Sequence, residues 1–248
     1  MSNLWLAFRF LTTLPLGRLS LAHSQLGKAA LWFPLVGGGL GGILIALETG
    51  FGQLLLFPNL VTAILVLAAW AWLTGGLHLD GVADCGDGLW ATASAERRLE
   101  IMQDPRLGAF GGITLFFFLM LKVAAFYALD QKWLAILMAA VLSRWIIVPI
   151  AFIYPSAREH GMAATLHREL VPMAWKVTLI YPIALIGIGG WPTVVIVAAV
   201  AGSAWGMAHF ANRRIGGMTG DVYGLLIEGT EIVVLLTHLA LTAHAIGI

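Results

Sequence analysis

Long apolar stretches separated by short polar segments run along most of the chain. A membrane-spanning helix needs about 20 mostly apolar residues, and seven stretches come close to that length. The pattern predicts an all-α fold, a polytopic membrane helical bundle of about seven transmembrane helices. The predicted spans cover residues 29–49, 60–77, 109–129, 133–154, 174–189, 193–211 and 224–246.

The N-terminal segment, residues 1–28, differs from these spans. Its apolar part, Leu4 to Leu16, contains Arg9 and ends in the Pro15-Leu16-Gly17 break. We therefore expect an interfacial or re-entrant segment. A charged n-region and a small-residue cleavage site are missing, which argues against a cleaved signal peptide. Further along, the glycine run from Gly37 to Gly42 predicts close packing between helices.

Composition supports a membrane protein. Of the 248 residues, 60% are hydrophobic and 11% are charged, and the mean hydropathy is +0.90. A soluble domain carries about 25% charged residues because its surface must stay hydrated. Lys and Arg number 14 against 13 Asp and Glu, so the chain lacks the basic excess of a nucleic-acid-binding protein. The single cysteine, Cys85, excludes a disulfide framework and a cysteine-based zinc site.

Basic residues alternate between the two sides of the predicted bundle. The segments on the side of the N-terminus hold eleven lysines and arginines, whereas the opposite segments hold only Lys132. Because basic residues concentrate in cytoplasmic loops, we expect the N-terminus to be cytoplasmic and the C-terminus to lie outside. The eleven are Arg9, Arg18, Lys28, Arg97, Arg98, Arg106, Arg158, Arg168, Lys176, Arg213 and Arg214.

Acidic residues gather in two windows, residues 78–108 and 212–231, both on the predicted cytoplasmic side. In the first window Asp80, Asp84 and Asp87 have the spacing i, i+4, i+7, which puts them on one helical face. Three like charges on one face repel each other unless a cation lies between them. Carboxylate oxygens without nitrogen or sulfur ligands favour Mg²⁺, with Mn²⁺ as the alternative, so the window predicts a metal site.

The second window combines Arg213 and Arg214 with Asp221, Glu228 and Glu231. Glu228 and Glu231 fall inside the last predicted span, where ionisable groups are costly and usually face a cavity or a partner.

Two basic residues also lie within predicted spans. Arg144 needs an anionic partner, and we expect it to approach Glu228, Glu231 or a substrate diphosphate. Lys122 can reach the membrane interface more easily by snorkelling, so it is a weaker candidate for such a pair.

Five stretches of the chain resemble the cobalamin synthase family, also called adenosylcobinamide-GDP ribazoletransferases. The resemblance covers nearly the whole chain, and its long and specific parts are the His-Leu-Asp-Gly block of the first acidic window and the Gly-Gly-Met-Thr-Gly-Asp block of the second. Cys85 and Gly86 occupy variable places of the family pattern, and Pro105 stands where the family often has a serine. The matching stretches are FLTTLPL from Phe10, FPLVGGGLGG from Phe33, GGLHLDGVADCGDG from Gly75, RRLEIMQDPRLGAFGG from Arg97 and RRIGGMTGDVYGLLIEGTE from Arg213.

The resemblance implies a multi-pass enzyme of the bacterial inner membrane whose active site faces the cytoplasm, with residues 1–248 as one catalytic domain. Such an enzyme joins adenosylcobinamide-GDP to α-ribazole or α-ribazole 5′-phosphate in the last steps of cobalamin synthesis, and it releases GMP. It requires a divalent metal.

The resemblance also implies roles for individual residues. Asp80, Asp84 and Asp87 would hold the metal, and Asp80 or a neighbouring carboxylate would accept the proton of the attacking hydroxyl. His78 and Asp104 are further catalytic candidates. The substrate and phosphate contacts would be Arg106, Arg144, Arg213 and Arg214, together with Asp221, Glu228 and Glu231, which could instead bind a second metal.

Other classes of protein fit less well. A CDP-alcohol phosphotransferase would carry an alanine-arginine pair after its second aspartate, where this chain has Cys85-Gly86. A prenyl-transferring membrane enzyme would need a second aspartate-rich motif of similar spacing. A cation transporter would place its acids near mid-bilayer, often in two repeated halves, and we find no internal repeat.

Overall fold

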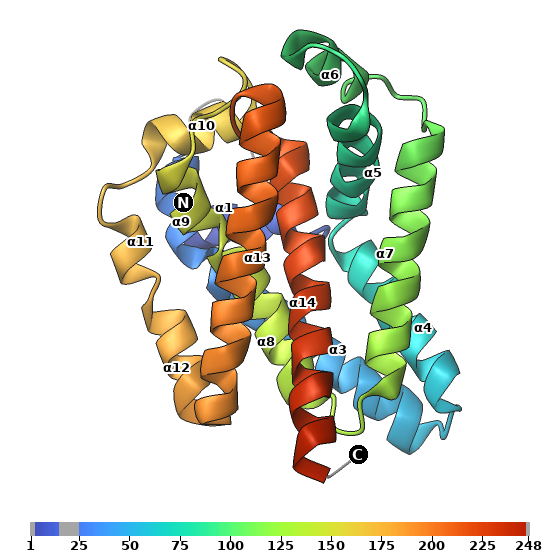
Figure 1. Ribbon diagram of the computed structural model, residues 1–248. Coiled ribbons are helices and arrows are strands. Elements are labelled where there is room, and N and C mark those ends of the chain that lie inside the picture. Colours follow the sequence, from blue (N-terminus) through green and yellow to red (C-terminus); the bar gives the residue numbers. More distant parts are fainter. Residues whose placement is uncertain (1–2, 15–24, 247–248) are drawn as a thin grey trace.

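The protein is a helical bundle in a computed structural model that describes residues 3–14 and 25–246. Two helices, α13 and α14, stand side by side along its full height (Figure 1). The described residues contain no β-strand, only an isolated bridge between Ser156 and Met218. The helices are α1 (Asn3–Leu11), α2 (Leu26–Ala29), η2 (Ala30–Trp32), α3 (Phe33–Thr49), η3 (Gly50–Leu54), α4 (Asn59–Leu73), α5 (Leu77–Trp90), α6 (Ala95–Ile101), α7 (Ala109–Ala128), α8 (Trp133–Trp145), α9 (Ile147–Ile153), α10 (Met162–Glu169), α11 (Ala174–Val177), α12 (Ile180–Gly189), α13 (Trp191–Ile215) and α14 (Gly220–Ile246).

Helix length and hydropathy confirm the predicted membrane bundle. Five helical runs of the described residues are long and apolar enough to cross a membrane. Two further pairs of helices qualify only together, because each pair is bent, α4 with α5 by 89° and α10 with α11 and α12 by 91°. If each bent pair is one span, the total is seven, as predicted. The five continuous runs are Leu26–Leu54, Ala109–Ala128, Trp133–Ile153, Trp191–Ile215 and Gly220–Ala243.

The bend between α4 and α5 departs from the sequence prediction of one straight span over 60–77. Gly75 and Gly76 have φ angles of 67° and 68°, a left-handed conformation that glycine adopts without steric penalty. Thr13 satisfies the carbonyl groups at the broken end of α4. Its backbone N–H donates to the Leu73 carbonyl at 2.8 Å, and its hydroxyl donates to the Trp72 carbonyl at 2.9 Å.

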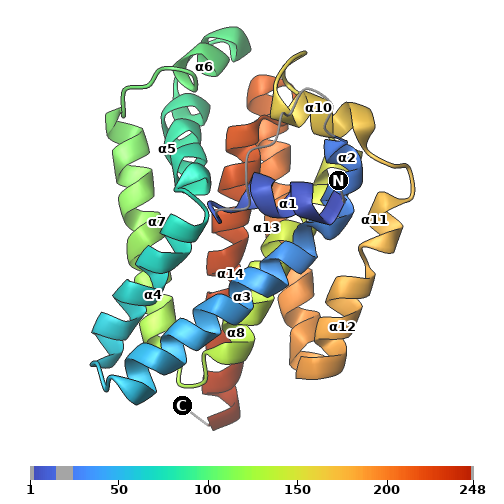
Figure 2. The same cartoon turned by 180° about the vertical axis from the view of Figure 1, so that it is seen from behind.

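The N-terminal helix α1 crosses the bundle, roughly perpendicular to its long helices (Figure 2). The ring of Phe10 stacks on that of Phe33 with centroids 5.6 Å apart. A short helix that lies across the spans agrees with the expected interfacial segment as far as the structure describes it. Residues 15–24, which include the Pro15-Leu16-Gly17 break and Arg18, lie outside the described residues.

Small residues allow the closest helix contacts in the core. Gly37 packs against the backbone of Ala140, and a Cβ at Gly41 would lie 3.3 Å from the Cα of Leu137. The predicted close packing of the glycine run is therefore confirmed, with α8 as the partner of α3. Helix α14 contacts α5, α7, α8 and α13, which makes it the central element of the bundle.

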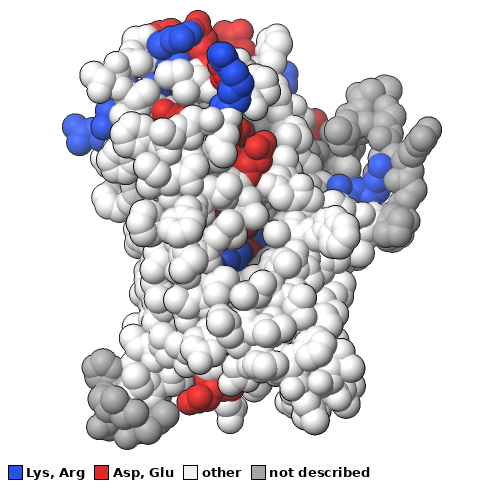
Figure 3. Space-filling view, turned by 90° about the vertical axis from the view of Figure 1, so that its right-hand side faces the viewer, with Lys and Arg blue, Asp and Glu red and all other residues white. Residues whose placement is uncertain are grey.

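Charged side chains concentrate at one end of the molecule. Figure 3 shows lysine, arginine and acidic side chains gathered at the upper end, while the broad surface below carries few charges. An uncharged belt between the ends is what a bilayer-embedded protein requires, because charges in hydrocarbon are costly. The bends and the crossings of α14 bring both acidic windows towards the charged end.

Candidate active site

Two glycines let α5 and α14 cross in close contact. A Cβ at Gly81 would lie 2.7 Å from the carbonyl oxygen of Asp221, and a Cβ at Gly224 would lie 3.0 Å from that of His78. Real Cβ atoms essentially never lie as close as 2.7 Å to another heavy atom, and 3.0 Å is tighter than nearly all real Cβ contacts. Because the neighbouring atoms belong to the backbone, a larger residue at either position would push the helices apart. The crossing places the first acidic window beside the start of the second.

Three carboxylates interact at this crossing. Asp80 is exposed, Asp84 and Asp221 are half-buried, and each of the three is repelled by the other two. Asp80 and Asp84 come from the predicted stripe on α5, and Asp221 comes from the first turn of α14. The structure therefore brings together aspartates of the two sequence windows that are more than 130 positions apart in the chain.

Arg158 is the basic residue of this cluster. Its Nη2 atom lies 3.7 Å from Asp221 Oδ2 and donates to the Leu99 carbonyl at 3.3 Å. The sequence analysis counted Arg158 only as a marker of the cytoplasmic side. Its position depends on a contact between two distant loops, in which the Ala157 N–H donates to the Met218 carbonyl at 2.9 Å, and local sequence contains no sign of that pairing.

A small cavity of about 80 Å³ adjoins the carboxylates. His78, Asp80 and Asp221 line one part of it, and apolar side chains line the rest. His78 is buried, and its Nδ1 atom has no hydrogen-bond partner among the described residues. The walls come mainly from α1, α3, α10 and α14 and include Phe10, Leu11, Phe33, Met162, Leu166 and Tyr223.

Helix α10 is tied to this cavity by a hydrogen bond. The hydroxyl of Tyr223 lies 2.8 Å from His167 Nε2, and Met162 and Leu166 of the same helix form part of the cavity wall. Sequence reasoning missed α10 as part of the site, because residues 162–169 were assigned to a cytoplasmic loop.

Asp87 is turned away from the other two aspartates of the predicted stripe. Its carboxylate accepts hydrogen bonds from the backbone N–H groups of Gly108 at 2.7 Å and Gly111 at 2.8 Å, at the N-terminus of α7. That carboxylate fills the space next to both glycines. Asp87 therefore stabilises the start of α7, where unpaired N–H groups and the helix dipole favour an anion.

The arrangement of the acidic side chains can be compared with the metal site expected at Asp80, Asp84 and Asp87. Among the described residues, no group of three His, Cys, Asp or Glu side chains is arranged to hold a metal ion, so Asp80, Asp84 and Asp87 do not form a three-ligand cage. Magnesium commonly takes one or two carboxylates and completes its shell with water and substrate phosphates. Asp80, Asp84 and Asp221 form no such three-ligand group either, but one or two of these oxygen-only donors fit that mode of binding.

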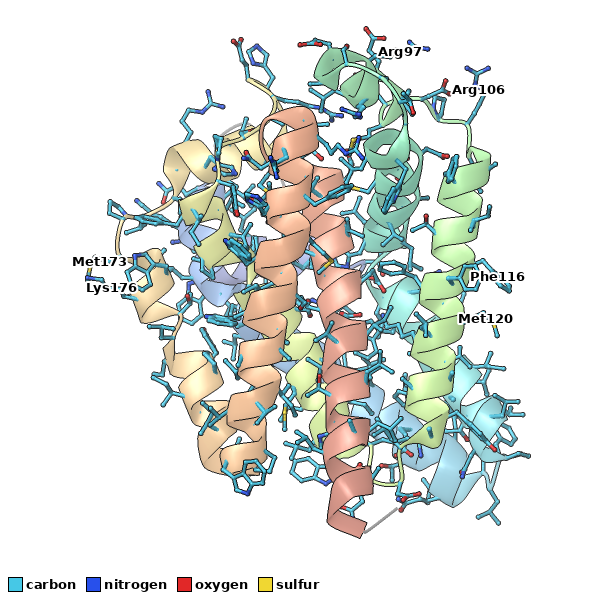
Figure 4. All side chains as sticks on the ribbon, viewed as in Figure 1. Arg97, Arg106, Phe116, Met120, Met173 and Lys176 are labelled. Carbon is cyan, nitrogen blue, oxygen red and sulfur yellow. The ribbon has the colours of Figure 1, made fainter. Side chains whose placement is uncertain are left out.

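Asp104 and Arg106 form an exposed pair of their own. Arg106 donates to Asp104 from its Nε atom at 2.9 Å and its Nη2 atom at 2.6 Å. These hydrogen bonds lower the pKa of Asp104 to about 2. The pair lies on the loop between α6 and α7, and Figure 4 shows Arg106 pointing outward there. Its charges already compensate each other, so it has no evident tie to the carboxylate cluster.

Arg213 and Arg214 also lie apart from the cluster. Arg213 is exposed, and the Arg214 guanidinium lies over the ring of Phe210, 5.1 Å from its centroid. Arg98 donates from Nη1 to the Arg214 carbonyl at 3.1 Å.

Glu228 and Glu231 belong to a buried ion-pair network. Lys122 Nζ lies 2.7 Å from Glu228 Oε2 and also bonds Glu231, and Arg144 pairs with Glu231. The predicted approach of Arg144 to a glutamate is confirmed. The snorkelling expected of Lys122 is wrong, because this residue is 5% exposed and lies 4.5 Å from the ring centroid of Trp70. Lys122 and Arg144 thus provide the cationic partners of both glutamates, and Glu231 is the anionic partner that Arg144 needs.

The fold and the site together define a polytopic helical membrane protein with a carboxylate-lined cavity at its charged end. The family model described as cobalamin-5-phosphate synthase matches residues 3–239, so the chain belongs to this family of enzymes.

Curated relatives agree with this assignment, and each of three is named adenosylcobinamide-GDP ribazoletransferase. The relative from Roseiflexus sp. (strain RS-1) is 37% identical over 93% of this chain and 87% of its own length. The relative from Herpetosiphon aurantiacus is 36% identical over 97% of both chains. The relative from Pseudomonas syringae pv. syringae is 38% identical over 94% of this chain and 97% of its own. No solved structure matched the chain.

Proposed function

We propose that this protein joins adenosylcobinamide-GDP to α-ribazole or α-ribazole 5′-phosphate and releases GMP, as the last assembly step of cobalamin synthesis. The observation that carries the proposal is the cluster of Asp80, Asp84 and Asp221 with Arg158, in a chain whose relatives are named for this reaction. A transfer from a diphosphate needs charge compensation and alignment more than covalent chemistry by the protein.

The reaction follows from the groups at hand. The ribazole 3′-hydroxyl oxygen forms a bond to the phosphorus that carries the cobinamide, and the bond from that phosphorus to the bridging oxygen breaks, so that GMP leaves with that oxygen. Asp80 or His78, which line the cavity, accepts the hydroxyl proton. Arg158 binds phosphate oxygens, because its planar guanidinium matches their geometry.

A divalent metal, Mg²⁺ or Mn²⁺, belongs to the proposal. When bound, it would neutralise the charge of the diphosphate and of the leaving group. One or two of the carboxylates of Asp80, Asp84 and Asp221 would hold it together with substrate phosphates, and Asp221 takes the place that Asp87 had in the sequence prediction. Of the other predicted contacts, Arg106, Arg213 and Arg214 are replaced by Arg158 in this proposal.

The proposal includes a location. The protein resides in the bacterial inner membrane as a multi-pass chain, with the charged end and its cavity facing the cytoplasm. The predicted segments on the side of the N-terminus hold eleven basic residues and the opposite segments hold one. This asymmetry supports the proposed orientation.

A coupled experiment tests the activity. Purified protein incubated with adenosylcobinamide-GDP and α-ribazole should release GMP, lose this activity in EDTA and regain it with added Mg²⁺. Asp221→Asn should reduce the rate by at least about 100-fold, in the range seen for groups that stabilise transition-state charge. Asp104→Asn, which alters an exposed carboxylate outside the cluster, serves as the matched control. GMP release at the wild-type rate by Asp221→Asn would refute the role given to the cluster.

A further inference from the structure

An apolar groove lies on the face of α5 opposite the carboxylates. Its free volume is about 480 Å³, within the range of about 300–1,000 Å³ that small-molecule sites occupy. Helices α5 and α7 form one wall, and α13 and α14 form the other. Aromatic rings dominate the lining, namely Trp90, Phe110, Phe117, Phe118 and Phe210.

The groove opens sideways towards the bilayer. The side chains of Trp90, Phe110 and Phe117 line it and are also more than half exposed. On α7 its lining runs from Phe110 to Leu121, a length of about 16 Å at a rise of about 1.5 Å per residue. The hydrocarbon core of a bilayer is about 30 Å thick, so the groove follows one leaflet from its surface to about the midplane.

Positive charge lies at the outer end of this groove. Met207, Phe210 and Arg214 follow each other on one face of α13, with Arg214 nearest the charged end of the bundle. The Arg214 guanidinium covers the Phe210 ring, and Phe210 in turn packs against Trp90 with centroids 5.3 Å apart. Arg98 is held at the same place by its hydrogen bond to the Arg214 carbonyl. An apolar slot one leaflet deep, with two arginines at its mouth, is complementary to an amphipathic anion.

We infer that this groove is a binding site for an anionic phospholipid, with an acyl chain along α7 and the phosphate at Arg214 and Arg98. The site is separate from the carboxylate cavity, since α5 lies between them, and it does not depend on the proposed reaction. It assigns a ligand to Arg214, which has no contact with the carboxylate cluster.

Two adjacent pairs of residues provide matched tests. Arg214 lies over the ring of Phe210, which lines the groove, whereas Arg213 next to it is exposed. Phe117 lines the groove, whereas Phe116 does not, although their exposed fractions are 58% and 57%. Figure 4 shows Phe116 pointing away from the bundle. Replacing either phenylalanine removes a similar lipid-facing ring and breaks the same edge-to-face contact between the two rings, whose centroids lie 5.5 Å apart. Only the replacement of Phe117 removes a lining residue of the groove.

Native mass spectrometry of the delipidated full-length protein measures the binding. We expect it to retain one phosphatidylglycerol in preference to phosphatidylcholine with the same acyl chains. Arg214→Gln should reduce that preference about fivefold, the effect of about 1 kcal/mol for one basic residue near a charged head group. Phe117→Ala should reduce the occupancy of both lipids. Arg213→Gln and Phe116→Ala should behave as the wild type.

Three results would overturn the inference. The first is equal retention of the two lipids by the wild type. The second is an equal change in lipid retention by Arg214→Gln and Arg213→Gln, or by Phe117→Ala and Phe116→Ala. The third is displacement of phosphatidylglycerol by adenosylcobinamide-GDP, since the groove would then belong to a corrinoid substrate. Lipid binding can thus be lost or kept independently of GMP release, so failure of this inference leaves the proposed function intact.

Discussion

Asp84 and Asp87 lie three residues apart on α5 but have different neighbours. Both are half-buried, and Asp84 is repelled by Asp80, Asp221 and Asp87, whereas the carboxylate of Asp87 has two backbone donors. A carboxylate close to other carboxylates destabilises the fold unless a bound cation compensates its charge. A carboxylate that accepts two backbone N–H hydrogen bonds stabilises the fold. Residues of the same type in one sequence motif therefore have different roles.

This contrast gives a prediction for three amide variants. Asp80→Asn and Asp84→Asn should lose at least about 100-fold in GMP release, with unfolding temperatures at or above that of the wild type. Asp87→Asn should instead lose about 1–3 kcal/mol of stability, because a half-buried, charged acceptor of two backbone hydrogen bonds is weakened. Thermal unfolding and turnover of the same purified samples separate the two effects. An Asp87→Asn protein as stable as the wild type would contradict the capping role.

The buried network around Glu231 leads to a second prediction. Lys122→Met leaves two carboxylates buried without one of their cations, and removal of one partner of a buried ion pair costs about 3–5 kcal/mol. Lys176→Met is the control, because Lys176 is exposed on α11 and points outward (Figure 4). We expect a large loss of thermal stability only in the first variant. The combined variant Lys122→Met with Glu228→Gln should regain part of it, and no recovery would argue against the pairing.

Sequence reasoning identified some of these partners and missed others for physical reasons. An arginine buried within a span needs an anionic partner. The candidate partners of Arg144 were therefore limited to the few acidic residues that also lie within predicted spans. Lys122 has a long, flexible side chain for which burial and snorkelling are both compatible with the sequence. Arg158 reaches Asp221 through the pairing of Ala157 with Met218, a contact between loops about 60 residues apart that no local pattern encodes.

At the level of elements, the site depends on how closely α5 and α14 approach. Gly81 meets the backbone of Asp221, and Gly224 meets that of His78. An alanine at either position requires the helices to separate, which moves Asp221 away from Asp80 and Asp84. The distance between the carboxylates, and so their ability to share a cation and a diphosphate, is therefore set by two residues without side chains.

Alanine at these glycines should reduce turnover more than stability. We expect Gly81→Ala and Gly224→Ala to lower GMP release at least about tenfold, because misplacement by about 1 Å can cost about 100-fold. Gly206→Ala is the control on the neighbouring helix α13, since a Cβ there meets nothing within 4 Å. Gel filtration in detergent checks that each variant stays folded. Full activity in both crossing variants would show that close approach is not needed.

The elements themselves were largely predictable. Apolar runs located the five continuous candidate spans and part of each of the two bent pairs, because the bilayer imposes a minimum length and excludes charge. The same runs did not reveal that two spans are bent, since hydropathy is unaffected by a turn at Gly75 and Gly76. Helix α10 was missed because it is short and packs over the cavity through only a few residues.

For the whole molecule, the asymmetry of charge determines how the chain is expected to sit in the membrane. Charged side chains gather at the end that holds α6 and the carboxylates (Figure 3), and most basic residues of the chain belong to that side. Because basic loops stay in the cytoplasm during insertion, this end should face the cytoplasm, where nucleotide-activated substrates are made.

Cysteine labelling in intact cells tests this orientation. Glu96→Cys and Arg213→Cys mark the charged end, and Gln53→Cys marks the opposite end; all three positions are exposed. The native Cys85 is buried, so the unmodified chain serves as the control for background. A membrane-impermeant maleimide should label position 53 in cells whose outer membrane alone is permeabilised, and positions 96 and 213 only after the inner membrane is opened. Labelling of positions 96 and 213 from opposite sides would place the two acidic windows across the bilayer from each other, and the joint site of Asp80, Asp84 and Asp221 could not then exist.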